Sequence, residues 1–410
     1  MKKLIYILSS LWVLLAFEST AQDDLNSYLV TAAENNPGLK AKFDDYMAAL
    51  EVAPQVGTLP DPQLAFGYFI QPVETRMGPQ RFKVSLTQMF PWFGTLNARE
   101  NVAAQAAKVK YELFEEAKSQ LFNDVRGTYF NLYFTQKAID ITHENLEILS
   151  AFQKLAVAKI EAGLVSTVDE YRIEMETGEL ENQLALLRDK MSSQTVLFNR
   201  LLNDTLDTPV KLPDDLWAND LEYSKMAILD SIRTQNHQLL KLELEREMYN
   251  LKQEVARKQG SPSISVGIDY INVGKGDMNL EGKDALMFPR IGLSIPLYRN
   301  KYNSMVKEVV LQESAKTFEK QNKDNMLEAI FEATFTEYTD ANRRIALYDK
   351  QLTLAQRSLN ILETEYATSG RNFEELLRME RKLLNYALEL EKAKTDKQAA
   401  ISNIKYLMGK

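Results

Sequence analysis

No cysteine occurs among the 410 residues, which excludes disulfide bonds, cysteine-ligated metal sites and the lipid-acceptor cysteine of a lipoprotein. Only two histidines are present, His143 and His237, and they lie far apart in segments expected to be helical. Because a lone histidine in a helix is more often a packing residue than a ligand, we expect no metal site. Phosphate-binding glycine loops and nucleophile elbows are also missing, so we expect no catalytic site, no enzyme activity and no cofactor.

Long apolar runs are missing too, apart from one near the N-terminus. The run from Leu4 to Phe17 is shorter than the roughly 20 residues that a membrane-spanning helix needs. Lys2 and Lys3 precede it, and small residues ending at Ala21 follow it. This pattern predicts a secretory signal peptide over residues 1–21, cleaved before Gln22, in preference to a membrane anchor.

Basic side chains are fewer than acidic ones. The chain has 49 basic and 57 acidic side chains, a formal net charge of −8. Loss of residues 1–21 would remove two lysines and one glutamate and make the charge more negative still. Such a balance argues against nucleic acid or acidic lipid as a partner.

What the sequence does have is an internal duplication. Asn36 returns as Asn236, Pro62 as Pro262 and, after an insertion, Pro91 as Pro296. Repeats of this kind define an architecture before any single element does. We therefore divide the chain into a first structural repeat over residues 22–203, a linker over 204–220 and a second structural repeat over 221–410.

Each repeat contains two segments with alternating apolar and polar residues, which is typical of strands with one apolar face. The four segments are residues 62–71, 81–90, 262–271 and 287–295. Each is about the length that a tilted strand needs to cross a bilayer. Turn residues are expected in the connections, with Pro72, Gly78 and Pro79 between the first two segments.

The two faces of these segments suit a membrane barrel. The polar faces carry charged residues such as Lys83, Asp269 and Arg290, which suits a water-filled lumen. Aromatic residues that would form an interfacial girdle follow the strands: Phe90, Trp92, Phe93 and Tyr298. An amphipathic hairpin in a soluble protein has the same period and remains an alternative.

Long stretches almost free of proline and glycine follow each strand pair and predict helices. They cover about 96–160 and 302–368, with turns at Gly163 and Gly370 and return helices to about 202 and 408. Apolar residues recur at near-heptad spacing, as expected for coiled-coil packing. The fold class is therefore mainly α with a membrane β-barrel portion. Because four strands cannot close a barrel and an open edge cannot face lipid, the chain must oligomerise to insert.

With these features in place, the whole mature chain resembles the TolC family of outer-membrane efflux channels. The resemblance rests on the duplicated order of elements, the pair Asn36-Pro37, the prolines Pro91 and Pro296, and the turn at residues 163–169. It implies a homotrimer with a 12-stranded β-barrel in the bacterial outer membrane, in contact with outer-membrane lipid. A periplasmic α-helical barrel would continue the β-barrel. A periplasmic adaptor (membrane fusion) protein and an inner-membrane pump of the resistance-nodulation-division type would be its partners.

The stretches at residues 59–64 and 85–91 look like the heavy-metal efflux branch, the CusC and CzcC type. This implies a passive conduit for heavy-metal cations. The same channel type serves drug efflux or type I protein secretion, and both remain alternatives for the cargo. A secreted soluble coiled-coil structural or adaptor protein is the alternative from another class.

The resemblance also implies functional positions at the two helical turns. The adaptor-docking tip would consist of Gly163, Leu164, Val165, Ser166 and Gly370. The periplasmic gate would consist of Asp169, Tyr366, Arg371 and Glu375. In the closed state Asp169 would pair with Tyr366, and Arg371 with a neighbouring backbone or hydroxyl group. Two departures weaken the match, because Val168 stands where the family has a hydroxyl residue and Arg378 where it has a second constriction acid.

Overall fold

The computed structural model describes residues 17–205, 208–275 and 282–410. Most of the predicted signal peptide, residues 1–16, lies outside the described residues. The first-repeat helices are α2 (Phe17–Asn35), α3 (Pro37–Leu50), α4 (Val52–Gly57), α5 (Thr95–Glu161) and α6 (Val168–Leu201). The second-repeat helices are α7 (Lys225–Gln235), α8 (His237–Gln259), α9 (Arg299–Ser369) and α10 (Phe373–Leu407). The strands are β1 (Gln63–Thr75), β2 (Gly78–Phe90), β3 (Ser263–Val273) and β4 (Ala285–Ser294). The mainly helical class with four strands is therefore confirmed.

The duplication is visible in matching hydrogen bonds. Asn36 interrupts the helices α2 and α3, and its side-chain amide donates to the carbonyl of Leu201 at 3.0 Å. Asn236 interrupts α7 and α8, and its amide donates to the carbonyl of Leu407 at 2.9 Å. Each asparagine therefore satisfies a carbonyl in the last turn of its own repeat's return helix, a group that the helix itself leaves without a partner.

Two compact units are present, and each contains parts of both repeats. The helical unit comprises the residues up to Ala41 together with Glu115–Asn236 and Asp324–Lys410. The strand-bearing unit comprises Lys42–Phe114 and His237–Lys323. None of the helices in the described ranges combines the length and apolar character needed to span a bilayer.

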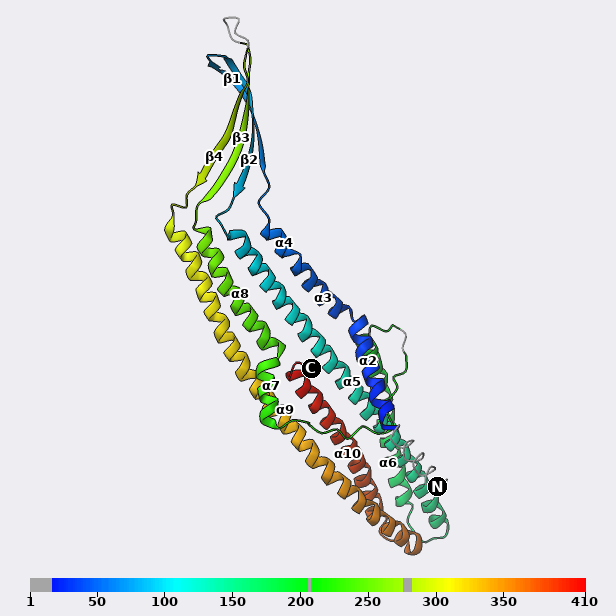
Figure 1. Ribbon diagram of the computed structural model, residues 1–410. Helices are drawn as coiled ribbons and strands as arrows, with labels where there is room; N and C mark the ends of the chain where they lie inside the picture. The colour runs from blue at the N-terminus through cyan, green and yellow to red at the C-terminus, as the bar shows by residue number, and fades with distance from the viewer. Residues whose placement is uncertain (1–16, 206–207, 276–281) are drawn as a thin grey trace, which may run out of the picture. The chain divides into compact units, whose positions relative to one another are not determined.

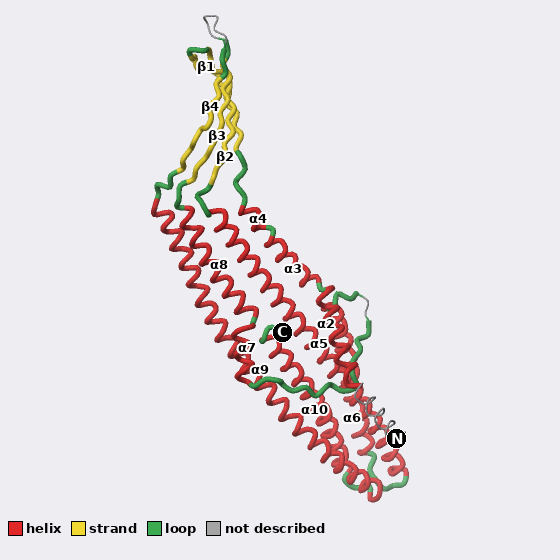
Figure 2. Tube along the Cα trace, viewed as in Figure 1, coloured by secondary structure: helices red, strands yellow, loops and turns green. Residues whose placement is uncertain are grey.

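In the strand-bearing unit the four strands form one antiparallel sheet in the order β1-β2-β3-β4 (Figures 1 and 2). The central pairing, β2 with β3, joins the two repeats. Its register places Leu86 opposite Ile268 and Ser85 opposite Asp269. The outer edges of β1 and β4 carry no neighbouring strand in the described chain.

The register confirms the predicted apolar and polar faces. Phe66 pairs with Val84, which pairs with Tyr270, which pairs with Leu286, so one apolar row crosses all four strands. This face is not covered within the chain, since Phe66 is 68% exposed and Ile70 is 90% exposed. Exposed apolar rows on this scale indicate a surface that meets another molecule or a membrane.

The first hairpin is tighter than its turn residues predict. The expectation that Pro72, Gly78 and Pro79 form the connection is wrong, because all three lie within strands and the turn is confined to Arg76 and Met77. The register shifts between Tyr68 and Val73, the interval that contains Pro72. Because proline cannot donate to a ladder, an irregular position of this kind accommodates it.

The core of the helical unit is built by four helices. Leu149 and Phe152 from α5, Ile173 from α6, Leu359 from α9 and Leu376 from α10 belong to one buried cluster. Close packing of such residues supplies most of the stability of a helical bundle. The cluster reaches the second helical turn, because Tyr366 and Phe373, on either side of that turn, are also members of it.

Candidate functional site

The turn between α5 and α6 is a glycine-terminated helix end. Gly163 has a φ of +68°, a value that favours glycine. The Leu164 amide donates to the carbonyl of Lys159, and the Gly163 amide donates to that of Ile160, both at 2.9 Å. This pair of bonds is a Schellman motif, so the turn expected at Gly163 is confirmed.

The turn between α9 and α10 is a simpler glycine-terminated helix end, with one hydrogen bond in place of two. Gly370 also has a φ of +68°, and its amide donates to the carbonyl of Tyr366 at 2.9 Å. The two turns touch: a Cβ atom added to Gly370 would lie 2.9 Å from Cγ1 of Val165. The structure therefore brings the predicted tip residues of both repeats together. Leu164, at 65% exposure, projects into solvent beside this contact.

Asp169 is held by an arginine that the sequence analysis did not single out. Its carboxylate lies 3.4 Å from Nη1 of Arg172, one turn further along α6. Nη2 of the same guanidinium lies 3.3 Å from the carboxylate of Glu374 on α10. Burial raises the pKa of Asp169, and the charge of Arg172 opposes that rise. Arg172 thus links α6 to α10 beside the turns, and its spacing from Asp169 is the only sequence signal for this role.

Tyr366 is a core residue as much as a candidate gate residue. It is fully buried, and its ring centroid lies 4.7 Å from that of Phe373, on the other side of the turn. Its hydroxyl has no hydrogen-bond partner among the described residues. Burial, and then the charge of Asp169, raise the pKa of Tyr366 to about 12. Asp169 is therefore near Tyr366, but the hydrogen bond expected between them is not formed within one chain.

A basic residue that the sequence analysis missed, Lys159, lies beside Tyr366. Its ammonium donates to the carbonyl of Ala367 at 3.0 Å. The same nitrogen lies 5.6 Å from the centroid of the Tyr366 ring, within the range of a cation–π contact. Lys159 therefore ties the end of α5 to the end of α9.

The other two predicted gate residues are on the surface of the chain. Arg371 is exposed, and its side chain makes no hydrogen bond or ion pair within the described ranges. Glu375 forms an ion pair with Arg378, one turn further along α10. Arg378, which replaces the expected second acid, thus offsets the charge of Glu375 in the single chain.

Further along the same four helices lies a buried carboxylate with two partly buried ones near it. Glu380 on α10 is 1% exposed and accepts a hydrogen bond from the side-chain amide of Asn145 on α5. Burial raises the pKa of Glu380 to about 7, and the charges of Glu176 and Glu363 add to the rise. Glu176, in turn, lies 3.4 Å from the guanidinium of Arg381. Nothing in the heptad pattern distinguishes Glu380 from a solvated glutamate.

The polar face of the sheet carries a charge network. The ammonium of Lys83 lies 2.7 Å from the Asp269 carboxylate, and Nε of Arg290 lies 3.4 Å from it. Arg290 also donates to the hydroxyl of Thr87. Its guanidinium passes close over Gly267, where an added Cβ would lie 3.1 Å from Nη2. One acid and two cations therefore connect β2, β3 and β4 on the face predicted to be wet.

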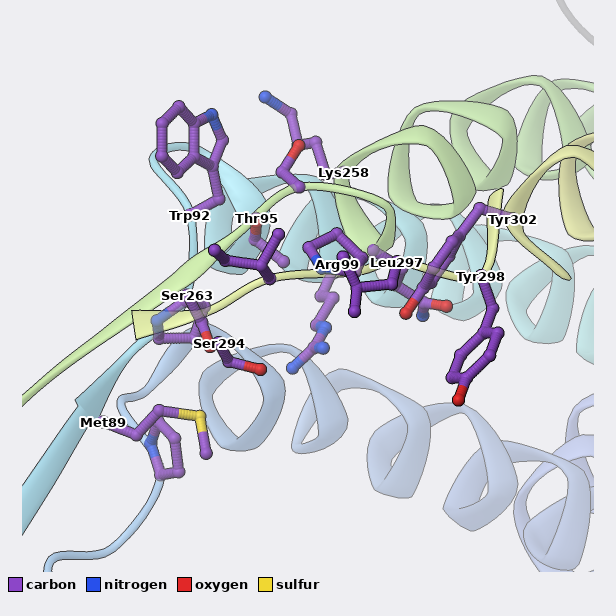
Figure 3. A pocket seen from close by; sticks show the side chains of 16 residues that line it. Met89, Trp92, Thr95, Arg99, Lys258, Ser263, Ser294, Leu297, Tyr298 and Tyr302 are labelled. Carbon is purple, nitrogen blue, oxygen red and sulfur yellow. The ribbon is translucent and has the colours of Figure 1, made fainter. Parts of the chain in front are cut away.

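Two of the expected girdle residues, Trp92 and Tyr298, line a pocket of about 360 Å³ where the strands end. Figure 3 shows Trp92, Arg99, Lys258 and Tyr298 among the side chains that line it. Tyr298 is 83% exposed, and Trp92 is half-exposed. Phe93 packs edge-on against Trp92 with ring centroids 6.0 Å apart. Aromatic and basic side chains are thus grouped at the ends of the strands.

Within the described ranges, no group of three or more histidine, aspartate or glutamate side chains could hold a metal ion. Each histidine lies beside a glutamate. His143 is 3.6 Å from Glu147, and His237 is 2.8 Å from Glu112.

The chain was compared with known protein families, curated proteins and solved structures. Residues 28–203, which lie within the predicted first repeat, match the family described as outer membrane efflux protein. No curated protein matches the sequence.

Several solved structures share the fold over nearly the whole chain. The outer membrane protein VceC from Vibrio cholerae is 13% identical, with a TM-score of 0.79, covering 95% of this chain and 97% of its own. CusC is 16% identical, with a TM-score of 0.76 and coverage of 94% and 92%. The CmeC outer membrane channel of Campylobacter jejuni is 15% identical, with a TM-score of 0.75 and coverage of 94% and 85%.

Proposed function

We propose that this chain is the outer-membrane channel of a tripartite efflux system, a passive duct formed by three copies. The observation that carries the proposal is the sheet. Its apolar rows are uncovered, its opposite face holds a charge network, and the outer edges of β1 and β4 are unpaired in the described chain. A sheet of this kind is stable in lipid only when further copies close it into a barrel.

Fractionation tests the proposal directly. The mature protein is expected in the outer membrane as a detergent-stable oligomer whose electrophoretic mobility changes on heating. A monomer in the soluble fraction would support the secreted coiled-coil alternative and contradict the channel.

We assign the docking tip and the gate of this channel to the two helical turns. Leu164, Val165 and Ser166 offer a surface to a periplasmic adaptor, which is coupled to an inner-membrane pump. Arg371 is exposed and lacks a partner within the described chain, so its side chain can bond across copies. The Tyr366 hydroxyl also lacks a partner there, but it is fully buried, so its bond in the gate would form within its own chain. Asp169 is the proposed acceptor for the Tyr366 hydroxyl, because its charge contributes to the raised pKa of the tyrosine. Bonds of this kind contribute roughly 0.5–3 kcal/mol each, which docking of an adaptor can overcome.

A double variant tests the gate. Asp169→Ala combined with Arg371→Ala should raise single-channel conductance in planar bilayers, because each substitution removes one of the two contacts proposed for the closed state. The matched control is Arg343→Ala, which changes an exposed arginine in the same unit. Wild-type conductance in the double variant would refute the gate assignment.

Heavy-metal cations are the proposed cargo, on the resemblance of residues 59–64 and 85–91 to the metal-efflux branch. Drug efflux and type I secretion use the same kind of duct, so the pump decides between them. A deletion strain should become sensitive to cadmium, zinc, copper or silver. Increased sensitivity to drugs alone would assign the channel to the drug branch.

A further inference from the structure

A pocket in the helical unit contains an arginine whose guanidinium is incompletely satisfied. The pocket has a volume of about 320 Å³ and is lined by residues from α2, α5, α7, α10 and the segment between α6 and α7. Arg126 on α5 lies in its wall, with its guanidinium 5.9 Å from the ring centroid of Phe122. The Nη1 atom of Arg126 is buried and has no hydrogen-bond partner within the described ranges.

A buried guanidinium nitrogen without a hydrogen-bond partner is unusual for an arginine whose role is only structural. Buried polar atoms nearly always have a hydrogen-bond partner, and leaving one without a partner costs free energy. Burial lowers the pKa of Arg126, as expected where a charge is poorly compensated. Arg126 lines the pocket, so an anion bound there would compensate its charge.

The surrounding charges favour an anion as the occupant. Lys405 and Lys410 also line the pocket, and the pKa of Lys405 is lowered by burial and then by the charge of Arg126. Of the two acidic side chains in the lining, Asp220 is already bound to Lys397 at 2.5 Å, which leaves Glu222 to act on Lys405. Three basic side chains therefore share one uncommitted acidic side chain.

The remaining walls are apolar and aromatic. Phe130 and Trp217 pack edge-on with ring centroids 6.0 Å apart, and Ile228 and Ile404 are fully buried. A hydrogen bond of 3.0 Å from Gln398 to the carbonyl of Trp217 holds this segment in place. The volume and the mixture of a few charged groups with apolar walls are typical of small-molecule sites.

We propose that this pocket binds a small organic oxyanion, a carboxylate or phosphate on an apolar body, with Arg126 as its principal ligand. The inference does not depend on the channel function. It concerns a site distant in sequence from both helical turns and from the strands.

Thermal unfolding of the full-length protein tests the proposal with three probes: benzoate, phenyl phosphate and the neutral isostere benzamide, at constant ionic strength. Benzoate or phenyl phosphate should raise the unfolding midpoint saturably, and benzamide should not. Arg126→Gln should weaken this effect at least about tenfold, as expected for a charge-assisted bond. The control Arg343→Gln should keep it, because that side chain is 73% exposed.

A second readout separates ligand binding from a structural role. Without probe, Arg126→Gln should unfold no earlier than the wild type, because the variant removes a poorly compensated buried charge. No saturable shift with either oxyanion, an equal shift with benzamide, or an undiminished shift in Arg126→Gln would overturn the proposal.

Discussion

At the scale of single residues, Glu380 is a buried acid whose charge the fold disfavours. Its pKa is raised to about 7, so the folded chain binds a proton that the unfolded chain has released. Protonation of Glu380 stabilises the folded chain. This contribution is fully present below about pH 4.5 and is lost as the pH rises through about 7. The corresponding change in the free energy of unfolding is about 3 kcal/mol.

Glu380→Gln removes this titration and keeps an acceptor for Asn145. The variant should match the wild type near pH 4.5 and unfold later than it at about pH 8, as measured by thermal unfolding at both values. Glu389→Gln, an exposed position on the same helix, is the control. A constant difference between Glu380→Gln and the wild type across this range would contradict the prediction.

Two variants at Tyr366 distinguish the contribution of its buried ring from that of its hydroxyl. Tyr366→Ala should cost about 3–5 kcal/mol of stability, because it removes a fully buried ring that packs on Phe373. Tyr366→Phe keeps the ring and should leave the unfolding midpoint nearly unchanged. If the hydroxyl takes part in the gate, this variant should still raise single-channel conductance. An unchanged conductance would limit Tyr366 to the core.

At the scale of elements, the two turns should respond differently to the same substitution. Gly163→Ala forces a left-handed residue at a cost of about 1–2 kcal/mol but meets open space. Gly370→Ala has the same backbone cost and also places its Cβ against Val165. Gly370→Ala should therefore be the more destabilising variant in thermal unfolding.

Gly178→Ala is the matched control, because Gly178 lies inside α6 with no neighbour within 4 Å of an added Cβ. There the substitution should stabilise by roughly 0.5–1 kcal/mol. Equal losses at Gly163 and Gly370 would show that the contact between the turns is unimportant.

The sequence predicted best the features that depend on a local pattern or on a single residue. Alternation predicted the apolar face of the sheet, and Gly163 and Gly370 predicted the helical turns, which the structure shows to be left-handed at both glycines. The pairing of β2 with β3 and the approach of Arg172 to Glu374 depend on packing between distant segments, which periodicity along one segment does not specify. The orphaned nitrogen of Arg126 was missed for the same reason, since an arginine in a helix is usually solvated.

At the scale of the molecule, the boundaries of the two repeats do not coincide with those of the two compact units. Each repeat supplies a strand pair and a long helix with its return helix, whereas each compact unit combines parts of both repeats. The sheet joins the repeats through β2 and β3 and leaves β1 and β4 as outer strands. Closure of the proposed barrel therefore requires contact between β1 of one copy and β4 of the next.

Cysteine cross-linking across those edges tests this central claim most directly, because the chain has no cysteine of its own. Gln63→Cys on β1 would be combined in turn with Met287→Cys, Gly292→Cys and Ser294→Cys on β4, which together sample the registers open to a pair of neighbouring strands. In outer membranes, oxidation of at least one pair should give covalent dimers and trimers, and nothing larger. Monomers alone in every pair, or a ladder that continues beyond three chains, would contradict a closed barrel of three copies.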